Sequence, residues 1–191
     1  RRHPPAGEGA MAAILNLDPE IIKATCAEVA EGQVVQAVNF NAPEQTVIAG
    51  HAAAVQRAAD ACKAKGAKRA LLLPVSAPFH CSLMQPAAER LKLRLAELTL
   101  HVPSIAVVNN VDVAVVSDPA LIKDALVRQA AAPVRWVEIM RAMQVAGVTQ
   151  VAECGPGKVL SGVAKRCAEG IVGLPMADLA GLDAAIAAVT C

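Results

Sequence analysis

A chain of 191 residues is long enough for one sizeable hydrophobic core or for two small lobes. Hydrophobic residues make up 55% of it and aromatic residues only 2%, and no run of about 18 apolar residues occurs, which argues against a membrane span. Its 18 basic and 17 acidic residues are spread evenly, which argues against a nucleic-acid surface, because such a surface carries a basic stripe interleaved with aromatic residues.

The cysteines and the first residues of the sequence further limit the class of protein that this chain can be. Six cysteines are present, but none forms a CxxC pair or a Cys/His spacing typical of zinc, so no metal site is predicted. The pattern favours reduced thiols in a cytoplasmic protein over a disulfide framework. The sequence begins at Arg1 without a visible signal peptide, and we expect it to be an excerpt from a longer chain.

The first part of the chain predicts two helices among four strands. Asp18-Pro19-Glu20 is typical of a helix start, with an N-cap aspartate followed by proline, and Gly66 closes a second helix. The expected strands are 10–17, 34–40, 45–49 and 67–75, and the expected helices begin at 19 and cover 52–65. This order is that of the split βαβ, ferredoxin-like unit, which we expect as a small lobe over residues 8–76.

Residues 77–191 predict an alternation of helices and strands. Strands are expected at 104–108, 149–153 and 171–176, and helices at 86–98, 120–129, 136–146, 158–167 and 183–189. Strands followed by helices favour an α/β core with a mostly parallel sheet. Because three strands are few for such a core, we expect residues 77–191 to be part of a larger one.

The loop after the fourth strand carries the strongest candidate for chemistry. Pro74 and Pro78 restrict its backbone, and His80 stands at its tip. Strand-end loops are where α/β folds place reactive groups, and histidine is well suited to move protons near neutral pH. We interpret His80 as a general base; the alternative is a loop histidine that only packs and caps a helix.

A histidine base needs a nucleophile to activate, and the sequence offers none that fits. None of its five serines stands in a G-x-S-x-G turn. Cys81 adjoins His80, but neighbouring side chains on a loop generally point apart, and we expect this cysteine to be structural. The base is therefore predicted without its nucleophile.

Three other positions leave alternatives open. Gln129 ends a helix, where its amide either orients the histidine loop by bonding a backbone carbonyl or is solvated. Asn109-Asn110 either line a cleft or make a turn. Residues 155–158 precede a helix whose free N–H groups suit an anion, although a tight turn is the more ordinary role.

These motifs together resemble a known family. The matching segments are 9–15, 38–43, 45–50, 66–70, 73–84, 107–112, 126–129 and 153–160, and they include Asn39-Phe40-Asn41 and Pro78-Phe79-His80-Cys81. They cover nearly the whole chain in order. The chain resembles the malonyl-CoA:acyl carrier protein transacylases of bacterial type II fatty-acid synthesis.

The resemblance implies an α/β-hydrolase-like core with an inserted ferredoxin-like lobe, and ping-pong acyl transfer. A serine takes malonyl from malonyl-CoA, and the phosphopantetheine thiol of acyl carrier protein then collects it. The family's base falls on His80, and the glutamine that holds the histidine loop falls on Gln129. The two substrates are the only small molecules implied, with no metal and no cofactor.

The resemblance also implies substrate contacts. Phe79 is the kind of residue that favours malonyl over methyl-branched units. Asn39 and Asn41 match a loop suited to the pantetheine or acyl-carrier side, and Asn110 is expected to line the substrate cleft.

The sequence differs from the family pattern in the segment that would precede Arg1. The segment with the oxyanion loop, the G-H-S-x-G turn and the malonyl-binding arginine is absent, and Arg1 and Arg2 fall after that arginine by spacing. We therefore expect a C-terminal part that is inactive alone and exposes apolar core faces. The rival readings are a non-catalytic module that binds acyl carrier protein or another partner, and an acyltransferase domain of a large synthase.

Overall fold

The computed structural model describes residues 9–75 and 77–190, and its contacts divide the chain into two compact units, Arg1–Arg135 and Trp136–Cys191. Arg1 and Arg2, and the end residues Glu8 and Ser76 of the predicted small lobe, lie outside the described residues. The expected boundary at 76/77 falls inside the first unit, because the histidine loop packs onto the sheet of that lobe.

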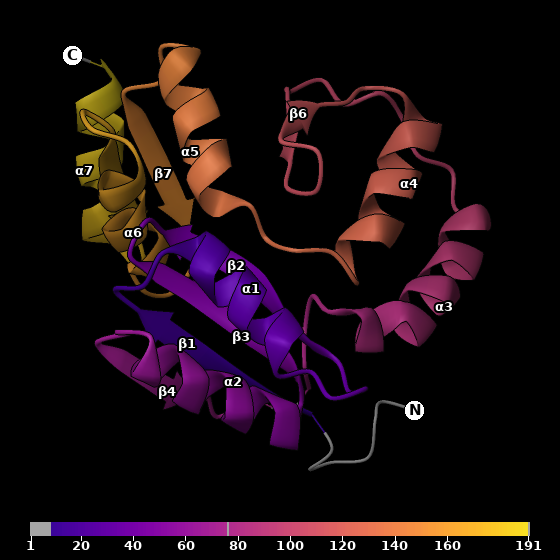
Figure 1. Ribbon diagram of the computed structural model, residues 1–191. Coiled ribbons are helices and arrows are strands. Elements are labelled where there is room, and N and C mark those ends of the chain that lie inside the picture. Colours follow the sequence, from indigo (N-terminus) through magenta and orange to yellow (C-terminus); the bar gives the residue numbers. More distant parts are fainter. Residues whose placement is uncertain (1–8, 76, 191) are drawn as a thin grey trace. The chain divides into compact units, whose positions relative to one another are not determined.

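A four-stranded antiparallel sheet forms the centre of the first unit (Figure 1). Its strands are β1 (Gly9–Leu15), β2 (Val35–Ala42), β3 (Gln45–His51) and β4 (Arg69–Leu72), in the order β2-β3-β1-β4. Helices α1 (Pro19–Glu28) and α2 (Ala52–Ala64) lie along one face. The strand and helix order along the chain is the one that the sequence predicts.

Sequence signals such as helix caps determine where these elements begin, and burial of apolar side chains stabilises them. The Asp18 carboxylate accepts a hydrogen bond from Glu20 N at 2.7 Å, as an N-cap should. Between the helices and the sheet, Ile14, Ile22 and Val55 are completely buried. Each such side chain contributes about 1.5–3 kcal/mol to stability.

The opposite face of the sheet receives the histidine loop. Met11, Val38 and Val47 on this face pack with the fully buried Cys81, and Leu73 and Leu83 complete the cluster. Successive side chains of a strand point to opposite faces of the sheet, so both faces are apolar. One face packs against the helices and the other against the histidine loop.

The rest of the first unit consists of helical elements, a short hairpin and the loops that join them. It comprises η1 (Ser82–Met84), α3 (Gln85–Ala96), β5 (Val108–Asn109), β6 (Ala114–Val115) and α4 (Pro119–Gln129). The predicted strand at 104–108 is wrong except for Val108, because in the described part of the chain residues 104–107 lie beside no strand that could receive their hydrogen bonds. The β5–β6 hairpin was not predicted; Asn109 makes it by accepting from Asp112 N and donating to Ala114 O.

The second unit is a small α/β assembly. It contains α5 (Trp136–Val145), β7 (Gln150–Cys154), α6 (Val159–Cys167), β8 (Val172–Met176) and α7 (Leu179–Thr190). Strands β7 and β8 pair in parallel, as the strand-helix-strand pattern predicts. Helix α7 begins four residues earlier than expected because Asp178 caps it at Gly181 N, 2.8 Å away. No helix among the described residues is long and apolar enough to cross a membrane.

Candidate active site

The histidine loop is seated on the first strand of the sheet. Leu73 N donates to Met11 O at 2.9 Å, which extends the β4–β1 pairing into the loop. Pro78 is fully buried, and it lies so close to Gly9 that a Cβ built there would be 2.5 Å from the Pro78 ring. Only glycine leaves room for this contact, so the start of β1 fixes one side of the loop.

A second set of contacts fixes the residues after the histidine. The Cys81 thiol is fully buried and donates to Pro78 O at 3.1 Å, and Ser82 N donates to the Gln36 side chain at 2.8 Å. Burial raises the pKa of the Cys81 thiol, which keeps it protonated and makes it a poor nucleophile. The expected structural role of this cysteine agrees with its position.

His80 is held in an unusual backbone conformation between these anchors. Its φ is +64°, in the left-handed region that costs a residue with a Cβ about 1–2 kcal/mol. Such strain persists only where the surroundings over-determine it, and it clusters at functional sites. The turn points the half-buried imidazole toward the C-terminal end of α4.

The imidazole contacts a carbonyl at that end. His80 Nδ1 lies 3.3 Å from Gln129 O, a last-turn carbonyl that has no partner within its own helix. Because a carbonyl only accepts, this contact assigns the proton to Nδ1 and leaves Nε2 as the acceptor nitrogen. In the described part of the chain Nε2 has no hydrogen-bond partner. An acceptor nitrogen that is left without a partner can receive a proton, which is one condition for a general base.

The Gln129 side chain has a different role from the expected one. Its amide does not bond a carbonyl of the histidine loop; Oε1 accepts from Asn110 Nδ2 at 2.9 Å and Nε2 donates to Ala132 O at 3.3 Å. The backbone carbonyl of Gln129 makes the contact with His80 instead, and this could not be read from the sequence, because a sequence does not show which main-chain groups are left unpaired.

Asn110 is engaged at both ends of its amide. Besides its bond to Gln129, its Oδ1 accepts from Arg135 N at 3.0 Å. The expected contact of Asn110 with substrate stays a prediction.

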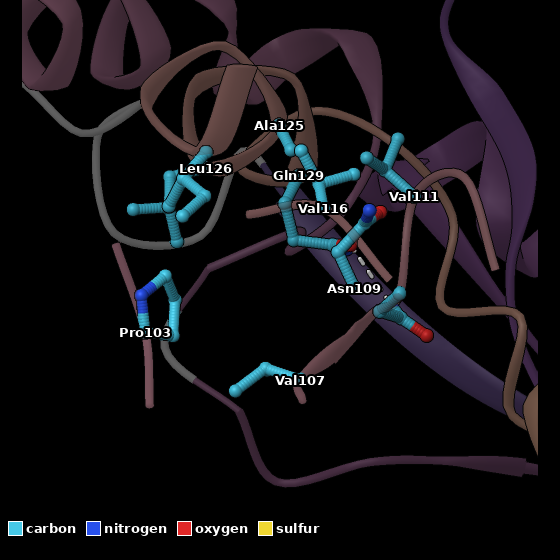
Figure 2. A pocket seen from close by; sticks show the side chains of 10 residues that line it. Pro103, Val107, Asn109, Val111, Val116, Ala125, Leu126 and Gln129 are labelled. Carbon is cyan, nitrogen blue, oxygen red and sulfur yellow. Dashed lines mark hydrogen bonds between the residues drawn. The ribbon is translucent and has the colours of Figure 1, made fainter. Parts of the chain in front are cut away.

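An apolar cavity of about 320 Å³ lies beside these two amides. In Figure 2, Pro103, Val107 and Leu126 surround its open interior together with Gln129. Its walls are Pro103, Val107, Asn109, Asn110, Val111, Val116, Ile122, Ala125, Leu126 and Gln129. Val107 is 58% exposed and Leu126 46%, so this region is an open apolar surface rather than a closed core.

The remaining predicted residues lie elsewhere in the first unit. Phe79, beside the histidine, is 38% exposed. Asn39 lies on β2 in a parallel bridge with Val134, and Phe40 N donates to Val134 O at 2.9 Å. Asn41 is half-buried on the same strand. Within the described residues no hydrogen bond joins Phe79, Asn39 or Asn41 to His80.

Comparison with known proteins decides the family. Residues 2–183 match the family described as the acyl transferase domain. The chain belongs to this family. A malonyl CoA-acyl carrier protein transacylase from Salmonella typhimurium is 52% identical over 95% of this chain. The chain spans 59% of that relative's length.

Solved structures agree with this assignment. The acyl-carrier-protein S-malonyltransferase of Burkholderia pseudomallei 1710b is 58% identical, with a TM-score of 0.92 over 96% of this chain and 60% of that one. A malonyl-transacylase solved in complex with a type II PKS acyl-carrier protein is 49% identical, with a TM-score of 0.94 over the same shares.

The glycine-rich turn of this acyl transferase domain is a structural feature. Glu153, at the end of β7, accepts hydrogen bonds from Leu160 N at 3.0 Å and from Ser161 N at 2.7 Å. These bonds lower the pKa of the Glu153 carboxyl. The helix N–H groups that an anion would need are thus occupied by a side chain of the chain itself, which favours the tight-turn reading of residues 155–158.

An ion pair next to Gln129 escaped sequence reasoning. Arg128 forms two parallel hydrogen bonds with Asp112, of 2.7 and 2.8 Å, and a third with Asp124 at 2.7 Å. The guanidinium holds the pKa of Asp112 below its usual range. The bidentate bond ties the last turn of α4 to the β5–β6 loop, and the pair's wide sequence separation hides it from local patterns.

The groups that could bind a metal ion or act as thiol nucleophiles can be placed within the described residues. The described residues contain no cluster of three or more side chains suited to a metal ion. Among the described cysteines no disulfide forms; these are Cys26, Cys62, Cys81, Cys154 and Cys167. Burial, with a smaller effect of the Cys62 charge, raises the pKa of Cys26 to about 12, so this thiol is unreactive near neutral pH.

Proposed function

We propose that this chain is the base-bearing part of a malonyl-CoA:acyl carrier protein transacylase. The observation that carries the proposal is the contact between His80 Nδ1 and Gln129 O, which leaves Nε2 as a proton acceptor. The names of the similar proteins supply the substrates, malonyl-CoA and acyl carrier protein. The finer fold assignment, a ferredoxin-like lobe over 8–76 on an α/β-hydrolase-like core, belongs to the same proposal.

In the first half-reaction Nε2 of His80 takes the proton of a serine hydroxyl that another part of the enzyme supplies. The serine oxygen attacks the malonyl thioester carbon, the carbon–sulfur bond breaks, and the CoA sulfur leaves with the proton from the imidazolium. The C-terminal end of α4 carries partial negative charge, and it stabilises the imidazolium between the two proton transfers.

In the second half-reaction the pantetheine thiol of acyl carrier protein gives its proton to Nε2. Its sulfur attacks the malonyl-serine ester, the carbon–oxygen bond breaks, and the serine recovers a proton from the imidazolium. Phe79 is proposed to limit the acyl group to malonyl, and Asn39 and Asn41 to contact the pantetheine or carrier side. Neither metal nor cofactor takes part, because a thioester is already an activated acyl donor.

The proposal also places the protein in the cytoplasm, where CoA thioesters and reduced thiols coexist.

Covalent labelling with radioactive malonyl-CoA tests the proposal. We expect the 191-residue chain to acquire no stable malonyl group, because none of its serines stands in a nucleophile turn. The whole enzyme, as a positive control, acquires one and passes it to the carrier thiol. A stable malonyl adduct on the chain alone would refute the missing-nucleophile claim, and a whole enzyme without label would refute the assigned reaction.

A further inference from the structure

We infer that Asn110 is a positioning residue that sets the orientation of Gln129 and, through it, the contact with His80. The inference rests on the proposed function for its catalytic meaning, but its geometry stands on the hydrogen bonds of the first unit. The sequence suggested a substrate contact for Asn110, and its bonds suggest a role behind the base instead.

The side chains of Asn110 and Gln129 form a hydrogen-bond network, and a main-chain group at each end fixes which atoms donate and which accept. Arg135 N can only donate, so the Asn110 oxygen must face it and the Asn110 NH₂ must face Gln129. Ala132 O can only accept, so the Gln129 NH₂ must face it and the Gln129 oxygen must face Asn110. Both amides therefore have one orientation that satisfies every donor and acceptor.

The hydrogen-bond network includes the side chain of the residue whose carbonyl, Gln129 O, contacts His80. Gln129 is the last residue of α4, where no further helical turn holds its peptide group. Its side chain bonds Asn110 on one side and Ala132 on the other, and Gln129 O also accepts Ala132 N at 3.4 Å. Fixing the side chain thus fixes the short turn from which the carbonyl reaches His80 Nδ1.

An isosteric substitution separates this role from packing. Asn110→Asp keeps the shape and the bond from Arg135 N but places a carboxylate oxygen against the Gln129 oxygen. Turning the Gln129 amide to suit it would bring its oxygen against Ala132 O, so no orientation satisfies both neighbours. The matched control is Asn109→Asp, which adds the same charge one residue earlier. It keeps the bond from Asp112 N and loses the bond to Ala114 O, but among the described residues it removes no bond to Gln129.

The readout is the ¹⁵N resonances of the His80 imidazole in the 191-residue chain, which report which nitrogen carries the proton. We expect Asn110→Asp to shift the population away from the form with the proton on Nδ1, while Asn109→Asp leaves it unchanged. Asn110→Ala, which removes the donor without adding charge, is the second variant and should give a smaller shift of the same sign. The inference would be overturned if Asn110→Asp and Asn110→Ala gave the same imidazole spectrum as the unsubstituted chain. Equal shifts in Asn110→Asp and Asn109→Asp would also overturn it.

The whole enzyme gives a second readout. A misplacement of about 1 Å at a catalytic group costs about 100-fold in rate, so we expect Asn110→Asp to lower kcat about 10- to 100-fold with little change in KM. A rise in KM at constant kcat would instead assign Asn110 to substrate binding. If the unsubstituted enzyme transfers no malonyl, the proposed function fails, and the imidazole measurement still decides the positioning role.

Discussion

At the scale of single residues, the site depends on main-chain groups whose availability a sequence does not reveal. His80 and Gln129 were both predicted, but their contact runs through the Gln129 carbonyl, and the loop is held by a glycine–proline contact and by Gln36. Residue types point to chemistry, whereas unpaired peptide groups emerge only when helix ends are placed. This is why the sequence could propose candidate residues but not the hydrogen bonds that connect them.

Gly9 gives the first prediction at this scale. Gly9→Ala should lower the free energy of unfolding by about 1–3 kcal/mol, because its Cβ overlaps the buried Pro78 ring. Urea titration followed by circular dichroism measures the change. Gly162→Ala is the matched control: its Cβ would meet nothing within 4 Å inside α6, and the substitution should add about 0.4–1 kcal/mol. Equal effects of the two substitutions would contradict the assigned contact.

At the scale of elements, strong local signals predicted most helices and strands. Asp18 and Asp118 cap α1 and α4, and each is followed by proline, so both starts were found from sequence. The short β5–β6 hairpin and the unpaired residues 104–107 were not found, because a strand forms only where a neighbour accepts its hydrogen bonds. The cap of α6 was missed because Glu153 lies seven residues before Leu160.

That cap gives a pH-dependent prediction. The folded-state pKa of Glu153 is lowered, so its contribution to stability is present above the unfolded value of about 4.3 and is lost as the pH falls through the folded value. Glu153→Gln should therefore be less stable than the parent at pH 7, and the two should converge in acid. Urea titrations from pH 7 to pH 3 test this, with the exposed Glu97→Gln as control. A stability difference that does not shrink in acid would contradict the assignment.

At the scale of the whole chain, the α/β class and the family follow from sequence. The expected exposure of apolar faces of a core sheet stays a prediction, but apolar side chains are exposed in the segment before β5. Ile105 is 77% exposed, and Val107, which lines the apolar cavity, is 58% exposed. Contiguous exposed apolar surface of this kind marks an interaction site or promotes association. The contacts divide the chain after Arg135, and contacts between distant segments decide such a division. The expected division into a lobe over 8–76 and a core over 77–191 stays a prediction.

Association follows from this surface. Light scattering after size-exclusion chromatography should show the 191-residue chain self-associating at micromolar concentration, and Ile105→Asp with Val107→Asp should reduce the apparent mass. A monodisperse monomer with a cooperative melt would count against the prediction.

The central claim is that His80 removes the proton from a nucleophile held by another part of the enzyme. The most direct measurement is the rate of malonyl-enzyme formation by the whole enzyme, mixed rapidly with labelled malonyl-CoA, with and without His80→Ala. The account predicts a rate about 10²- to 10⁴-fold lower in the variant, at unchanged thermal stability. A variant that forms the malonyl-enzyme as fast as its parent would contradict it.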